Sequence, residues 1–68
     1  MNELTWNVNM LWRGRRVLGW IGRSDSVENP WYGRTAGTKE VPFIRAEFEI
    51  EQAAKDFVMF LASTQENQ

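Results

Sequence analysis

Apolar and polar residues alternate through positions 4–12, and this period of two is typical of a half-buried β-strand. One parity is apolar, whereas Thr5, Asn7 and Asn9 occupy the other. The apolar set is Leu4, Trp6, Val8, Met10 and Trp12. We therefore expect a single strand that turns this set toward the core.

The alternation breaks at Gly14, which arginines flank on both sides, and apolar residues return at positions 17–23. Because glycine accepts the positive φ that tight hairpin turns need, residues 4–23 are predicted to form a hairpin. A polar loop that ends in Asn29-Pro30 separates this hairpin from a third strand at 31–36. Residues 41–44 are a candidate for a short fourth strand, and Pro42 suits a strand at a sheet edge.

The last third of the chain has the periodicity of a helix from about 50 to 62. Apolar residues recur there at the three- and four-residue spacing of a stripe that faces a core. The stripe is Ile50, Ala53, Ala54, Phe57, Val58 and Leu61. Met59 falls opposite this stripe, so we expect it to be exposed. The pattern predicts one α+β domain over 1–68: a three- or four-stranded antiparallel sheet with one C-terminal helix on one face.

The far face of this sheet cannot be wholly polar, because the return strand carries apolar residues on both parities. A two-residue turn at Gly14-Arg15 would pair Trp12 with Val17 and place Leu18 and Trp20 beside Leu11 on the far face. A three-residue loop would send Leu18 and Trp20 to the core and leave Val17 and Ile21 outside with Leu11. Both registers stay open, since a one-residue slip exchanges the two faces.

An apolar cluster bordered by arginines is typical of an interaction surface. Tryptophan and arginine are also the residue types that dominate binding hot spots. The candidate partner-binding residues are Leu11, Arg13, Arg15, Arg16, Trp20, Arg23 and Arg34. We expect the partner to be a protein. Burial of the same face between two copies is a further expectation, because 68 residues without cysteine give a thin stability margin.

Composition argues against catalysis. The chain has no cysteine and no histidine, which removes the usual nucleophile–base pairs and the usual zinc ligands. It also has no glycine-rich phosphate loop. We therefore expect no enzymatic activity, no cofactor, no metal and no small-molecule substrate. The absence of a signal-peptide pattern and of a long apolar run predicts a cytoplasmic protein without a membrane segment.

Nucleic-acid binding is the alternative hypothesis. The formal charge is +3 over residues 1–39 and −4 over residues 40–68, and the arginines of the basic half are interleaved with aromatic residues that could stack on bases. The sequence pI of about 5.3 opposes this hypothesis, because nucleic-acid-binding domains are usually strongly basic.

Three segments carry a resemblance in layout: residues 12–21 (WRGRRVLGWI), residues 31–34 (WYGR), and Phe48 followed by Ala53-Ala54-Lys55. This order of hairpin, third strand and alanine-containing helix resembles very short phage and prophage accessory proteins, such as sheet-plus-helix anti-CRISPR inhibitors. It is also similar to the arm-binding domains of tyrosine integrases. The first resemblance implies stoichiometric binding to a host protein, often as a dimer, and the second implies binding to DNA.

Overall fold

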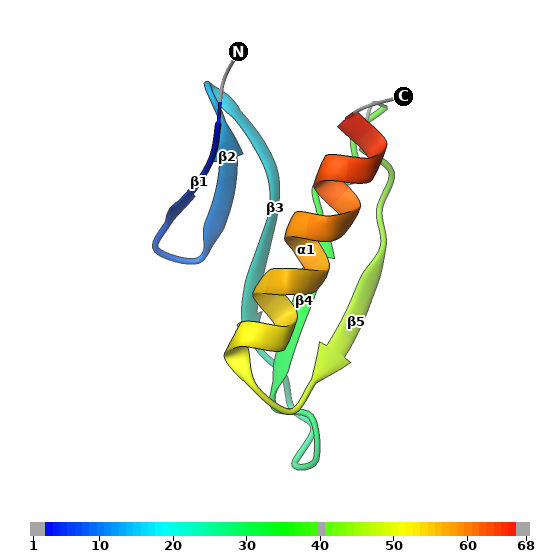
Figure 1. Cartoon of the computed structure of the whole chain (residues 1–68). Helices are drawn as coiled ribbons and strands as arrows, with labels where there is room; N and C mark the ends of the chain where they lie inside the picture. Colours follow the sequence, from blue (N-terminus) through cyan, green and yellow to red (C-terminus); the bar gives the residue numbers. More distant parts are fainter. Residues whose placement is uncertain (1–2, 40, 67–68) are drawn as a thin grey trace.

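The computed structural model describes residues 3–39 and 41–66. Within them, five antiparallel strands form one sheet in the order of the chain, and a C-terminal helix packs against one face of that sheet (Figure 1). The elements are β1 (Leu4–Asn7), β2 (Met10–Arg13), β3 (Arg16–Arg23), β4 (Trp31–Thr35), β5 (Arg45–Phe48) and α1 (Glu51–Glu66). The predicted α+β class is confirmed, whereas the sheet has more strands than the three or four expected.

The expected strand over residues 4–12 is two strands joined by a turn at Val8-Asn9. Asn7 pairs with Met10 across this two-residue turn, so residues that pair have opposite parity. The turn therefore reverses the alternation: Trp6 packs against the core, while Met10 and Trp12 lie on the other face of the sheet. The expectation that Val8, Met10 and Trp12 join the core is wrong, and Val8 is 86% exposed at the turn.

Val8 has a φ of 61°, and it is the one non-glycine residue with a positive φ in the described chain. A β-branched side chain is strained in this conformation, which asparagine tolerates far better. We expect Val8→Asn to stabilise the fold by about 1 kcal/mol, which corresponds to a rise of roughly 4–8 °C in Tm for a domain of this size. Thermal unfolding followed by circular dichroism measures it. Val27→Asn is the matched control, since Val27 is 95% exposed and has no positive φ; an equal rise in both variants would contradict the role of strain.

The second turn follows the two-residue alternative at its tip, where Arg13 pairs with Arg16 and Trp12 with Val17. A bulge then shifts the register, so that Leu11 pairs with Gly19 and Met10 with Trp20. The extra residue lets Leu18 join the buried cluster although Val17 and Trp20 stay partly exposed. Leu11 itself is 0% exposed, and its expected place on the far face is therefore wrong in both alternatives.

Residues 41–44 form a loop instead of the expected fourth strand, and β5 begins at Arg45. The buried hydroxyl of Thr35 organises this loop: it donates to the carbonyl of Pro42 and accepts from the N–H of Ile44 at 2.8 Å. Gly37 and Thr38 both donate their N–H groups to the carbonyl of Val41, at 2.9 and 2.8 Å. These bonds satisfy the backbone without a ladder and bury the side chain of Val41.

The core lies between α1 and the sheet. Ala54, Val58 and Ala62 of the helix are fully buried, whereas Phe57 is partly buried against Phe48, with ring centroids 5.1 Å apart. Leu61 is also only partly buried, so two members of the predicted core-facing stripe are not fully enclosed. The stripe is displaced from its predicted centre: Ile50 is 60% exposed just before the helix begins, and Met59 packs against the core instead of facing solvent.

Candidate protein-binding face

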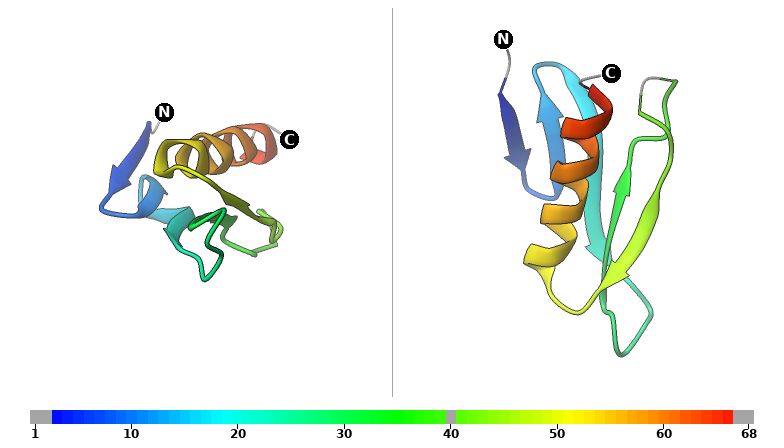
Figure 2. Two further views of the ribbon diagram at one scale, coloured as in Figure 1. Left: turned by 90° about the horizontal axis from the view of Figure 1, so that it is seen from below. Right: turned by 45° about the vertical axis from the view of Figure 1, so that its right-hand side comes forward.

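The helix covers one side of the sheet, and no described element covers the other side (Figure 2). Strand registers identify the residues that point away from the helix. Gly19 and Gly33 face Val58 of α1, so their neighbours Trp20, Tyr32 and Arg34 point to the opposite side. We call this side the open face and define it by Met10, Trp12, Trp20, Tyr32, Arg34 and Arg45.

Arg34 is held between two aromatic rings on the open face. Its guanidinium carbon lies 4.1 Å from the ring centroid of Trp20 and 4.8 Å from that of Phe43. Its Nε and Nη2 atoms donate to the carbonyls of Thr35 and Ala36, at 3.0 and 3.1 Å. Stacking and hydrogen bonding thus fix the side chain before any partner arrives.

A second arginine of the open face, Arg45 of β5, is also stacked on an aromatic ring. The guanidinium carbon of Arg45 lies 4.6 Å from the ring centroid of Tyr32, and its Nη1 is 3.5 Å from a carboxylate oxygen of Glu47. The hydroxyl of Ser24 donates to the same carboxylate oxygen. The open face therefore combines large aromatic rings with arginines whose positions are already set.

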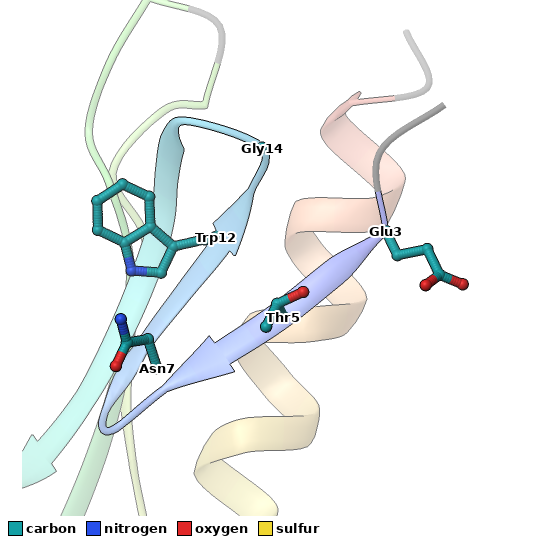
Figure 3. Close-up of a pocket in the computed structure, with 5 residues that line it drawn as sticks. All are labelled: Glu3, Thr5, Asn7, Trp12 and Gly14. Atoms are coloured by element: carbon teal, nitrogen blue, oxygen red, sulfur yellow. The ribbon is translucent and has the colours of Figure 1, made fainter.

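Two hollows lie on this side of the molecule. A hollow of about 310 Å³ is lined by Asn9, Met10, Trp20 and Tyr32. A larger cleft of about 560 Å³ follows β1 and is lined by Glu3, Thr5, Asn7, Trp12 and Gly14 (Figure 3). The Nε1 atom of Trp12 is buried and has no acceptor, and the side chain of Asn7 lies on the same side of the hairpin.

The structure brings together only part of the predicted site. Trp20 and Arg34 are neighbours on the open face, whereas Leu11 is buried beneath it. Arg15 and Arg16 are exposed at the β2–β3 turn with Arg13 beside them, at one end of the sheet.

Arg23 stacks on Trp31 at 4.8 Å, on the side that faces the helix. The predicted partner-binding set omits four residues of the open face, namely Met10, Trp12, Tyr32 and Arg45. The signal that could have identified part of this set is the alternation along β4, because Tyr32 and Arg34 flank Gly33 and therefore lie on the same face of the strand.

Comparison with protein-family models, with curated proteins and with solved structures found no match for this chain. Among the described residues, no cluster of three or more metal-ligating side chains could hold an ion. Within the same part of the chain, no helix is long and apolar enough to cross a membrane.

Proposed function

We propose that this protein is a non-enzymatic binding module that recognises another protein through its open face. The observation that carries the proposal is the uncovered array of Trp20, Tyr32, Arg34 and Arg45, in which both arginines are stacked on aromatic rings. Tryptophan, tyrosine and arginine dominate the energetics of protein interfaces. Side chains that are already ordered lose less conformational entropy on binding, which favours affinity.

The hydrogen bonding of these arginines favours a protein partner over a nucleic acid. Arg34 directs two donors to its own backbone, and Arg45 faces a carboxylate. A phosphate would have to compete with these groups, and a base would have to displace a guanidinium to reach the face of Trp20 or Tyr32. The acidic pI of the chain points the same way.

The biological role that fits such a module best is stoichiometric inhibition or regulation of a host protein, such as a defence complex, inside the cell. The resemblance in layout to short phage and mobile-element accessory proteins supports this role. The exposed arginines of the β2–β3 turn would extend the contact beyond the open face at one end of the sheet.

The nucleic-acid alternative predicts a different response to salt. Affinity for DNA or RNA falls steeply as salt rises, because bound counterions are released when cations contact phosphates. We expect a gel-shift titration with generic duplex and single-stranded DNA to show no tight complex at 50 or at 200 mM salt. A tight complex at low salt that weakens by about 10³-fold at the higher concentration would overturn the proposal.

The basic turn gives the complementary prediction for a protein partner. Replacing Arg15 and Arg16 together by glutamate should abolish the complex with that partner while leaving the circular dichroism spectrum unchanged, because both side chains are exposed. The partner is isolated by capture from nuclease-treated host lysate. Lysines at both positions are the matched control and should retain binding, since they keep the charge. Equal binding by the glutamate variant would exclude the turn from the interface.

A further inference from the structure

The two edges of the sheet differ in how well they are protected against pairing with another strand. The edge strand β5 carries Arg45 and Glu47, and charged side chains are a common device that keeps an edge from pairing with another strand. The edge strand β1 has the sequence Leu-Thr-Trp-Asn, with no charge, proline or bulge. Of the common devices that keep an edge from pairing, β1 therefore has only its short length of four residues.

The backbone of β1 presents hydrogen-bonding groups to solvent. Asn7 and Met10 flank a two-residue turn, so they form a hydrogen-bonded pair, and Thr5 and Trp12 form the next such pair. Since hydrogen bonding alternates along an antiparallel strand, the N–H and C=O groups of Leu4 and Trp6 point away from β2. This edge can therefore pair with another strand whose free N–H and C=O groups have the same two-residue spacing.

The side chains of β1 are complementary to those of a second β1 strand that runs antiparallel about a twofold axis at Thr5. In this register Leu4 of one copy lies opposite Trp6 of the other, which is an apolar pair on the helix side of the sheet. The Nζ atom of Lys55 lies over the ring of Trp6, 5.4 Å from its centroid. Glu3 lies opposite Asn7 on the open side, where a carboxylate can accept a hydrogen bond from an amide. Thr5 faces its own copy at the axis, and threonine pairs are favourable across strands.

We propose that the protein is a homodimer in which two β1 strands pair in this register and join the sheets into one of ten strands. The cleft beside β1 supports the assignment, because it is lined by Glu3, Thr5 and Asn7, which this register brings opposite their counterparts. The carboxylate of Glu3 from the second copy arrives beside Asn7, in the region where the buried Nε1 of Trp12 lacks an acceptor (Figure 3).

Dimerisation through the open face is less favourable than pairing of the edges. A twofold contact whose axis passes near Arg34 and Arg45 would bring these arginines toward their copies, and like charges in an interface are costly. Edge pairing leaves the open faces of both copies exposed on one side of the joined sheet. It therefore goes beyond the proposed function without competing with it.

Sedimentation velocity tests the dimer. Protein concentrations from about 1 to 200 μM span the order of magnitude of the dissociation constants expected for a short interface. We expect a mass near twice the chain's 8.0 kDa at the upper concentrations. Thr5→Lys places like charges opposite one another at the axis and should weaken the dimer by about tenfold or more, as should Thr5→Glu. An equimolar mixture of the two variants should restore it, because the charges then oppose one another as a pair. Val27→Lys, in the exposed loop before β4, should leave the dimer intact.

Three outcomes would overturn the proposal: a monomer at every concentration, a dimer that is indifferent to charge at Thr5, or a mixture that fails to reassociate. Circular dichroism of each variant verifies that Thr5, an exposed residue, was replaced without unfolding. A monomer that still binds a host protein through its open face would leave the proposed function standing and would remove only the dimer. A dimer that binds no host protein would leave the proposed dimer standing and would remove the proposed function.

Discussion

Gly19→Ala is expected to destabilise the fold by about 3 kcal/mol and to lower Tm by roughly 15 °C. A β-carbon at this position would lie 2.4 Å from the carbonyl oxygen of Arg34 and 2.7 Å from Cγ1 of Val58. The first obstacle is backbone of the neighbouring strand and the second is a fully buried side chain of α1. Neither can move without separating the helix or β4 from β3. Since small domains are only marginally stable, most of the native state should be lost at physiological temperature.

Gly22→Ala is the matched control on the same strand. Its β-carbon would lie 2.6–2.7 Å from the ring tip of Tyr32, on the open face. That ring belongs to a partly exposed side chain, so it can rotate away at small cost. Thermal unfolding of both variants measures the difference. Equal losses at the two positions would contradict the close approach of the helix to β3 at Gly19.

Trp20→Ala should weaken binding of the protein partner by about 30-fold or more, the effect of losing a central aromatic hot spot worth about 2 kcal/mol. Trp20 lies at the centre of the open face, between Met10 and Arg34 in the sheet. Its removal would also free Arg34 from one of its two stacking partners. Isothermal titration with the captured partner measures the change. Phe60→Ala is the matched control, since Phe60 is an aromatic residue of α1 that is 69% exposed on the helix side of the molecule.

The start of the helix and the position of the second turn could be predicted from the sequence because their signals are local. The expected end of the helix near residue 62 is too early, since α1 continues to Glu66. The three- and four-residue spacing of Ala54 and Val58 identifies the buried side of the helix, and Gly14 identifies a turn that requires a positive φ of 63°. The predicted bounds of the third strand, 31–36, agree with those of β4 to within one residue.

The first turn could not be predicted, because Val8 contradicts the residue preferences of the turn that it forms. Val8 occupies a conformation that asparagine or glycine would normally fill, and the alternation around it continues without a break. Once this turn is missed, the parity of every residue from 10 to 13 is reversed. This single error placed Leu11 outside and Trp12 inside.

The loop that precedes β5 was missed for a different reason. Its main organiser is the hydroxyl of Thr35, which bonds to backbone groups seven and nine positions further along the chain. Such contacts leave no periodic signal in the sequence. The sequence predicts a far face that is partly apolar and bordered by arginines, but Leu11, Leu18 and Ile21 are buried in the core. The stacking of Arg34 and Arg45 on aromatic rings depends on the strand register, which the sequence leaves open.

The proposed dimer would affect how the proposed open face binds a target. Two open faces on one side of a joined sheet would make the dimer bivalent. Binding of the second face then occurs at the high effective concentration set by the first, provided that the target presents two sites within reach. A target with a single site would gain no such increase.

If the open face contacts another protein, a substitution on that face should remove the partner from a capture experiment, and a substitution on the helix side should not. Wild-type protein, Trp20→Glu and Phe60→Glu are immobilised at equal density, exposed to the same nuclease-treated host lysate, and compared by quantitative mass spectrometry. We expect at least one host protein that is enriched equally on wild type and Phe60→Glu and lost on Trp20→Glu. Enriched proteins that bind all three baits equally, or that are lost only on Phe60→Glu, would exclude the open face as the binding surface.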